Sequence, residues 1–288
     1  MPAKTILSPG QRAALFNPPG DRDTIERLYT LGPDDLAQVC RRRRGANRIG
    51  YAVQLCYLRH PGRALFPDEL PSRDMLDLLA AQIGGSAEDF ARYAERAPTL
   101  REHRAEIGPY LGMRPFERSD LRAMLTLGQE VATSTDRGEP IVAAMVERLR
   151  HVRVVVPAAS TLERVALIAR AQARRVAHAG LIRDLTAEQE LALAGLIDPG
   201  EQGRTGLGWL REWPEAPTAS NLKAIAERLS RVRSLRIEPE RARRIHAARY
   251  SVIARVANIV TAQALRRMER RRRVATLVAA VIELEAAL

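Results

Sequence analysis

The side chains that could carry out catalysis or bind a metal stand at no spacing that either activity requires. The two cysteines form no CxxC pair and no cluster with histidine, and the five histidines, His60, His103, His151, His178 and His246, fall at no metal-binding spacing. The sequence also lacks a GxxxxGK phosphate-binding loop, a GxSxG elbow and an HExxH pair. The carboxylates are scattered beside arginines, where exposed ion pairs are the usual outcome. We therefore expect no catalytic residue, no metal site and no cofactor in this chain.

The chain is strongly basic, and nearly all of its positive charge is arginine. Among 46 basic residues only Lys4 and Lys223 are lysines, and the formal net charge is +12. Residues 228–273 hold 15 basic and 3 acidic side chains, so this segment carries the net charge of the whole chain. Guanidinium groups bind phosphate and guanine in a bidentate manner. The distribution predicts a polyanionic partner, with nucleic acid favoured over an anionic membrane surface.

Composition and pattern predict an all-α fold in which several short helices are followed by long ones. Aromatic residues make up only 4% of the chain, so the cores must be built from aliphatic side chains, which suits helix packing. Capping-box patterns predict helix starts at Ser8, Ser86, Thr99, Ser160 and Thr186. The strand-like run at 152–156 is too short to form a sheet, and we expect a connector there.

The distribution of Pro and Gly indicates domain edges near residues 70 and 158. We expect a helical DNA-binding module over 1–70 and a second, helix-turn-helix-like one over 71–158. Residues 159–288 are expected to hold a helical linker and the start of a further helical domain, with long helices over 219–235, 239–262 and 263–287. Cys40 and Cys56 are expected in apolar interiors. No signal-like segment is found, which predicts a protein of the cytoplasm.

The first module resembles a helix-turn-helix unit with Gly45 in its turn. Its second helix, from Ile49 to Tyr57, is apolar on nearly every face and is therefore expected to be buried rather than to contact bases. The neighbouring arginines are predicted to contact phosphates instead, although a solvated basic helix end remains an alternative. With the basic run at 266–273, the predicted phosphate contacts are Arg41, Arg42, Arg43, Arg44, Arg48, Arg59, Arg63, Arg266, Arg267, Arg270, Arg271, Arg272 and Arg273.

The second module, from Asp74 to Met113, is predicted to end in a polar helix that starts at Thr99 after an Ala97-Pro98 turn. A helix that reads bases in the major groove must offer exposed hydrogen-bond donors near its N-terminus. Arg101, His103 and Arg104 are the predicted base contacts. An ordinary exposed surface helix is an equally open alternative, because such helices also carry mixed charges.

Several ordered segments resemble the N-terminal region of Tn-three family replicative transposases. They include LSPGQR from Leu7, RRRRGANRIGYAVQLCYLRHPGR from Arg41, YAERAPTLREHRAEIGPYLGMRPF from Tyr93 and GLGWLREWPEAPTASNL from Gly206. The resemblance implies helical modules that recognise the terminal inverted repeats of a transposon. It also implies that the chemistry belongs to a later RNase-H-like domain, so this chain is expected to be a truncated transposase or a piece of one and not itself an enzyme.

The implied partner is double-stranded DNA at transposon ends, and self-association or pairing with a full-length transposase is a further expected contact. A bacterial, nucleoid-associated location follows from that partner. We expect no small-molecule substrate and no membrane association. Two alternatives stay open: a regulatory or structural helical module that binds protein, and a binder of anionic membranes that uses the arginines at 266–273 beside the apolar run Val274–Ile282.

Overall fold

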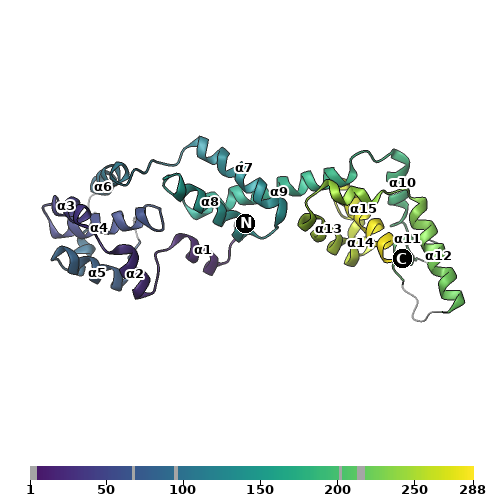
Figure 1. Ribbon diagram of the computed structural model, residues 1–288, viewed down its shortest axis with the longest axis horizontal. Coiled ribbons are helices and arrows are strands. Elements are labelled where there is room, and N and C mark those ends of the chain that lie inside the picture. Colours follow the sequence, from purple (N-terminus) through teal and green to yellow (C-terminus); the bar gives the residue numbers. More distant parts are fainter. Residues whose placement is uncertain (1–4, 67–68, 94–96, 201–202, 213–217) are drawn as a thin grey trace. The chain divides into compact units, whose positions relative to one another are not determined.

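A computed structural model of the chain describes residues 5–66, 69–93, 97–200, 203–212 and 218–288 (Figure 1). The all-α prediction is confirmed: within these residues the regular elements are α-helices and two short 3-10 helices. Backbone pairing of the β type is limited there to isolated bridges, Arg114 with Val154 and Pro199 with Thr205. The run at 152–156 is thus a connector, as predicted, and its Val154 and Val156 side chains are buried.

The described residues divide into two compact units. The first unit holds the described residues up to 128 and those of 137–167, and the second holds residues 129–136 and the described residues from 168 onward. The first contains α1 (Pro9–Phe16), α2 (Arg22–Tyr29), α3 (Pro33–Cys40), α4 (Gly45–Arg59), α5 (Arg73–Ile83), η1 (Ala87–Arg92), α6 (Ala97–Tyr110), most of α7 (Arg118–Ser134), α8 (Gly138–His151) and the start of α9 (Ala159–Ile182). The second contains the rest of α9, α10 (Ala187–Gly195), α11 (Gly206–Arg211), α12 (Ala219–Ser234), η2 (Pro239–Arg244), α13 (Ala247–Ile259), α14 (Ala262–Arg266) and α15 (Arg270–Ala287).

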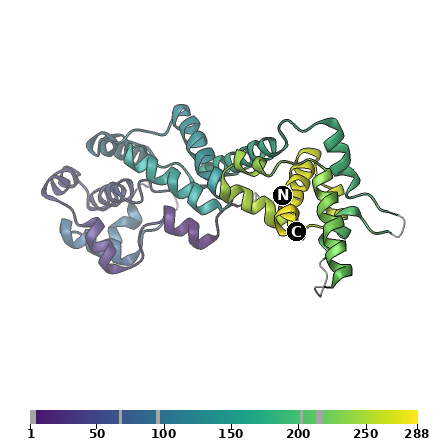
Figure 2. The same cartoon turned by 45° about the vertical axis from the view of Figure 1, so that its right-hand side comes forward.

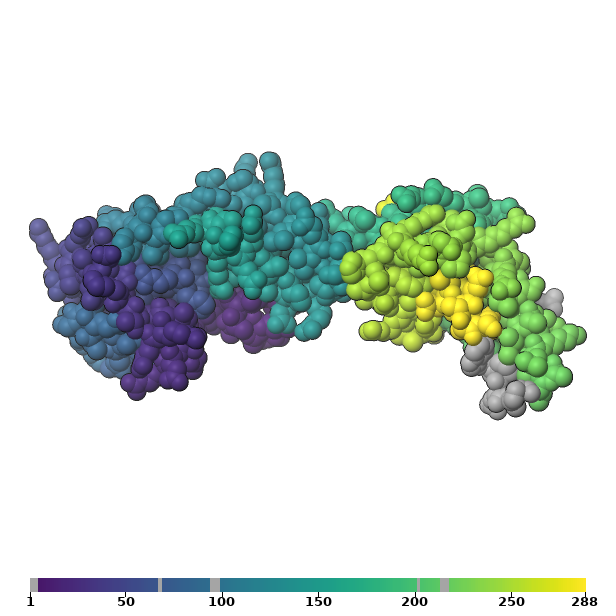
Figure 3. Space-filling view, viewed as in Figure 1, coloured from purple at the N-terminus to yellow at the C-terminus, as the bar shows by residue number. Residues whose placement is uncertain are grey.

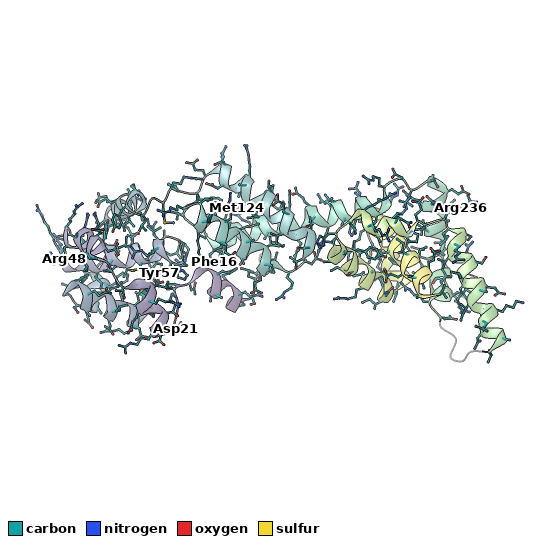
Figure 4. The ribbon with its side chains drawn as sticks, in the orientation of Figure 1. Phe16, Asp21, Arg48, Tyr57, Met124 and Arg236 are labelled. Atoms are coloured by element: carbon teal, nitrogen blue, oxygen red, sulfur yellow. The ribbon has the colours of Figure 1, made fainter. Side chains whose placement is uncertain are left out.

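Helix α4 forms the centre of the first unit. Every residue from Ile49 to Leu58 is buried, and α3, α5, η1 and α6 pack against the helix. Burial of this helix was predicted from its apolar sequence and is confirmed. Gly50 is required by the packing, because a Cβ atom there would overlap the ring of Tyr93. Figure 4 shows Tyr57 in the interior and Arg48 at the outer end of the same helix.

The helix starts predicted from capping boxes are partly confirmed. Ser8 and Thr186 form complete capping boxes on α1 and α10. Ser86 caps η1, a 3-10 helix. Thr99 and Ser160 instead lie inside α6 and α9, which begin at Ala97 and Ala159, so these two predicted starts are wrong by one or two residues. The expected turn at Ala97-Pro98 is likewise replaced by the first residues of α6.

A second set of contacts joins α1, α8 and α9 within the first unit. Arg12 of α1 donates two hydrogen bonds to Glu163 of α9, at 2.9 and 2.8 Å. Arg150 at the end of α8 donates to the carbonyls of Pro61 and Leu15, at 2.7 and 2.9 Å. The bond to Leu15 satisfies a carbonyl in the last turn of α1, which the helix end leaves without an intrahelical partner. Arg150 is therefore a structural arginine.

Helix α15 forms the centre of the second unit. Each residue from Val274 to Ile282 is buried, and α10, α12, α13 and η2 pack around the helix (Figure 2). Figure 3 shows the end of α15, in yellow, reaching the surface between green segments of the same unit. The apolar run that the membrane alternative needs is thus part of the core. No helix in the described ranges combines the length and the apolar character needed to cross a bilayer.

Three sequence-based expectations about boundaries and burial are wrong. Residues on both sides of position 70 share one hydrophobic cluster, from Ile25 to Ile107, so no edge separates them. The predicted helices over 239–262 and 263–287 are divided into η2, α13, α14 and α15, because His246, Thr261 and Glu269 accept N-terminal backbone hydrogen bonds and start new helices. Cys40 is exposed at the end of α3, whereas Cys56 is buried as expected.

Candidate nucleic-acid interface

Helix α6, predicted to read bases, is tied to the core by one of the residues assigned to that task. His103 is only 4% exposed, and its Nδ1 atom accepts a hydrogen bond of 2.8 Å from the Tyr93 hydroxyl when that nitrogen is unprotonated. Gln54 of α4 donates to the same hydroxyl. Burial, followed by the charge of Arg42, lowers the pKa of His103. The prediction that His103 contacts a base is therefore wrong. Its side chain is buried and hydrogen-bonded to Tyr93 instead.

Arg104 is also turned toward the protein. It is partly buried and donates to the carbonyl of Leu65 and to Gln54 Oε1, the latter at 3.3 Å. Only Arg101 of the three predicted base contacts is exposed without a carboxylate partner among the described residues. Glu102 and Glu106 are exposed on the same helix, and Glu106 pairs with Arg42 at 2.7 Å, so α6 presents the mixed charges that the sequence already showed. The role of Arg101 stays a prediction.

Basic side chains gather at the turn between α3 and α4 and in the first turn of α4. We call Arg41, Arg43, Arg44 and Arg48 the α4 cluster, of which all but the half-buried Arg48 are exposed. Within the described part of the chain no carboxylate pairs with any member of the cluster. Arg41 contacts only the Gln38 side chain, at 3.2 Å, and Arg48 Nε donates to the carbonyl of Arg42. These guanidinium groups keep their charge available to an external anion.

The N-terminus of α4 lies within this cluster. Its N-cap residue, Arg44, makes no side-chain cap, and the first turn holds no acidic residue. Backbone N–H groups at such a helix start attract anions, and phosphate is the common occupant. Asp89, paired with Arg92 at 2.8 Å, packs so closely on Gly45 that a Cβ atom there would overlap its carboxylate. The helix start is thus positioned by η1 on one side and flanked by arginines on the other.

Three of the predicted phosphate contacts in this unit are engaged with the protein. Arg42 lies 4.6 Å from the centre of the Tyr51 ring and pairs with Glu106 at 2.7 Å. Arg59 pairs at 2.7 Å with the buried Asp35, a carboxylate that also accepts the Tyr110 hydroxyl. Arg63 is 3% exposed and neutralises Glu69. The surface role predicted for Arg63 is wrong, because its guanidinium lies in the interior.

The basic run at 266–273 extends from the end of α14 into the start of α15, and it too contains arginines that bind the protein and arginines that pair with no carboxylate among the described residues. Arg266 donates two hydrogen bonds to the Ile197 carbonyl, Arg270 pairs with Glu190 at 2.5 Å, and Arg273 reaches the Arg266 carbonyl. The remaining members are exposed and have no carboxylate partner within the described ranges; we call Arg267, Arg271 and Arg272 the α15 cluster.

The sequence analysis missed basic residues that the structure leaves accessible. Arg118 and Arg122 lie one turn apart on α7, both exposed and unpaired among the described residues, while Met124 on the same helix is buried (Figure 4). Their i, i+4 spacing, which places both side chains on one face of a helix, could have identified this pair from the sequence.

The sequence analysis also missed a contact in the interior of the second unit. Arg174 and the buried Arg249 both bind the carboxylate of Asp136, although long stretches of sequence separate the three residues. No local sequence pattern predicts a contact between residues so far apart in the chain.

This all-helical fold with exposed arginine clusters belongs to a defined protein family. Residues 6–171 match the family described as a domain of unknown function, DUF4158, and the chain is a member of that family. The matched segment covers nearly the whole first unit, including α4, α6 and the α4 cluster.

The chain is also similar over its length to transposases of several bacterial transposons. It is 36% identical to the transposase for transposon Tn3926 of Escherichia coli over 284 residues, and 36% identical to that for Tn501 of Pseudomonas aeruginosa over 285 residues; each comparison covers 98% of this chain. Identity to the transposase for Tn1546 of Enterococcus faecium is 29%. The chain spans 29% of the length of these relatives. The predicted resemblance to Tn-three family transposases is confirmed.

Proposed function

We propose that the chain binds double-stranded DNA and recognises the terminal inverted repeats of a transposon as part of a transposase. The similarity to transposases gives the chain a role related to transposition, and DNA is the polyanion on which such proteins act. Within this proposal the chain contributes recognition, and the strand chemistry belongs to residues outside it.

The observation that carries the proposal is the α4 cluster at the start of α4. Four arginines without carboxylate partners in the described structure lie at a helix N-terminus whose N-cap makes no side-chain hydrogen bond and whose first turn holds no acidic residue, and Asp89 of η1 is the carboxylate packed against its Gly45. An ordinary solvated surface balances its charges with nearby acids, as Arg22 does with Glu26 at 2.9 Å. A helix start combined with unpaired guanidinium groups is suited to a phosphodiester.

The double variant Arg43→Ala/Arg44→Ala is expected to weaken binding to inverted-repeat DNA and to scrambled DNA by the same factor. The slope of log affinity against log salt should become shallower by about 0.9 for each phosphate contact removed. Fluorescence anisotropy titrations at several salt concentrations measure both quantities. Arg22→Ala is the matched control, since it removes one exposed arginine from the same unit outside the cluster. Unchanged affinity and slope in the double variant would contradict the proposal.

Arg101→Ala tests base recognition separately from phosphate binding. If Arg101 contacts a base edge, its loss should relax preference at one or two base pairs, by about 1–3 kcal/mol for each contact, without changing thermal stability. Titrations against a set of single-base variants of the inverted repeat measure the preference. Arg104→Ala is the comparison, because its bonds to Leu65 and Gln54 predict a lower melting temperature. A uniform loss across all sequences would assign Arg101 to a phosphate.

A further inference from the structure

A small cationic cavity lies inside the second unit. Its volume is about 180 Å³, and its polar walls are formed by Asp136, Arg174, His178, Arg249, Arg272 and Thr276, with apolar side chains of α13 completing it. The walls come from α9, α13, α15 and the segment before α8. Helices α13 and α15 lie side by side in both ribbon views (Figures 1 and 2).

Arg249 is the buried member of the cavity wall. Its side chain is 3% exposed and donates to the carboxylate of Asp136 and to the carbonyls of Ala132 and Thr135. Its Nε atom is buried without a hydrogen-bond partner among the described residues. A buried guanidinium is costly unless its charge and its donors are satisfied. The environment of Arg249 therefore favours additional negative charge.

One carboxylate serves more than one arginine in this cavity. Asp136 also accepts hydrogen bonds from Arg174, at 2.8 to 3.2 Å. Burial opposes ionisation of Asp136, but the bonds from Arg174 and Arg249 outweigh it and lower its pKa. Asp136 is thus ionised and carries a single negative charge against two guanidinium groups.

Arg272 adds a further positive charge, and its side chain has no partner in the described structure. Glu269 is close enough to affect His178, but its carboxylate already accepts the backbone N–H groups of Arg271 and Arg272 at the start of α15. Burial, then Arg272 and Arg174, lower the pKa of His178, which keeps the imidazole uncharged at neutral pH. Even with Glu269 counted, positive charge is in excess around the cavity.

We propose that this cavity binds a phosphate group. Its arginines outnumber its carboxylates, and guanidinium groups match the oxygens of a phosphate in geometry as well as charge. Its volume suits one such group rather than a larger molecule. The phosphate can belong to the DNA backbone or be a free phosphate ion. The inference goes beyond the proposed function, because the site recognises the group itself whichever molecule carries it.

Calorimetric titration of the full chain with inorganic phosphate tests the site, with sodium chloride of equal ionic strength as reference. Arg272→Ala removes an exposed wall residue whose side chain has no hydrogen-bond or ion-pair partner among the described residues, so the fold is expected to persist. Arg271→Ala is the matched control on the same helix turn, outside the cavity wall. We expect saturable binding to the native protein and to Arg271→Ala, and affinity at least about tenfold lower in Arg272→Ala, as the loss of a charge-assisted hydrogen bond implies.

A second titration, with duplex DNA in the presence of phosphate or chloride at equal ionic strength, identifies the source of the phosphate. If phosphate displaces DNA and Arg272→Ala weakens DNA binding more than Arg271→Ala does, the cavity takes a backbone phosphate. If phosphate binds without displacing DNA, the cavity takes the free ion, and the inference also stands.

No saturable binding of phosphate to the native protein, or equal loss in Arg271→Ala and Arg272→Ala, would overturn the inference. DNA binding that persists in that case leaves the proposed function intact. Phosphate binding in a protein that binds no DNA would reject the proposed function alone.

Discussion

Replacing Arg63 by alanine is expected to unfold the first unit under conditions in which the native protein is stable. The guanidinium, 3% exposed, donates to the Phe16 carbonyl at 2.6 Å and makes two bonds to Glu69, at 2.6 and 2.5 Å. Removing it leaves the Glu69 carboxylate partly buried and unpaired. Breaking a buried ion pair on one side costs about 3–5 kcal/mol, a large share of the roughly 5–15 kcal/mol that holds a typical domain folded.

Urea denaturation followed by circular dichroism measures this loss. Arg22→Ala, which breaks the exposed Arg22–Glu26 pair, should cost less than about 1 kcal/mol. Arg63→Lys keeps the charge but loses the bidentate geometry, so its stability should lie between those of the native protein and Arg63→Ala. If Arg63→Ala kept native stability and lost only DNA affinity, Arg63 would be a phosphate contact after all.

The loss of folding stability caused by Arg63→Ala should also depend on pH. Burial opposes ionisation of Glu69, but hydrogen bonds from Arg63 and from the backbone of Phe66 outweigh it and lower its pKa below the ordinary 4.5. A carboxylate with a lowered folded-state pKa stabilises the fold above its unfolded-state pKa, and this contribution is lost as pH falls through the folded value. The stability difference between native protein and Arg63→Ala should therefore narrow as the solution is acidified below about pH 4.

The helical class and the burial of α4 could be predicted because both follow from local patterns. Apolar residues on nearly all faces of a helix leave it no exposed position, and the structure buries Ile49 to Leu58 accordingly. The breaks between η2, α13, α14 and α15 were not predicted. Residues 239–287 contain no Pro or Gly apart from Pro239, and the helical periodicity of the sequence continues through the whole range. The caps at His246, Thr261 and Glu269 decide these boundaries, and each resembles an ordinary polar helix residue in the sequence.

The candidate site shows a similar limit. Local sequence identified where arginines gather, but whether an arginine is free or engaged depends on partners far along the chain. Arg43 and Arg44 have none among the described residues, whereas Arg59 meets Asp35 and Arg104 meets the Leu65 carbonyl. His103 shows the same effect, because Tyr93 supplies a buried hydrogen-bond partner that polarity alone does not reveal. Polarity in the sequence therefore predicts exposure only where the tertiary structure offers no partner.

Affinity for DNA is expected to fall by about a thousandfold or more when salt rises from 50 to 200 mM. Within the described ranges, the arginines of the two clusters that pair with no carboxylate are Arg41, Arg43, Arg44, Arg48, Arg267, Arg271 and Arg272. Each phosphate contact releases counterions and adds about 0.9 to the slope of log affinity against log salt, so engagement of both clusters predicts a slope near −6. Anisotropy titrations on the inverted-repeat duplex at four or more salt concentrations measure it.

Variants of one cluster at a time show which clusters contact the DNA. Replacing the α4 cluster by alanine should make the slope of log affinity against log salt shallower by the contribution of about four phosphate contacts. Replacing the α15 cluster should make it shallower by the contribution of about three. Arg22→Ala and Arg73→Ala, whose side chains pair with Glu26 and with Asp77 and Glu88, serve as controls and should leave the slope unchanged. The cluster variants should lose salt dependence but keep their preference for inverted-repeat over scrambled DNA, because contacts to phosphates do not depend on the base sequence. A native slope shallower than about −2 would mean that neither cluster neutralises the DNA backbone as a whole, and the phosphate-binding role of both would be rejected.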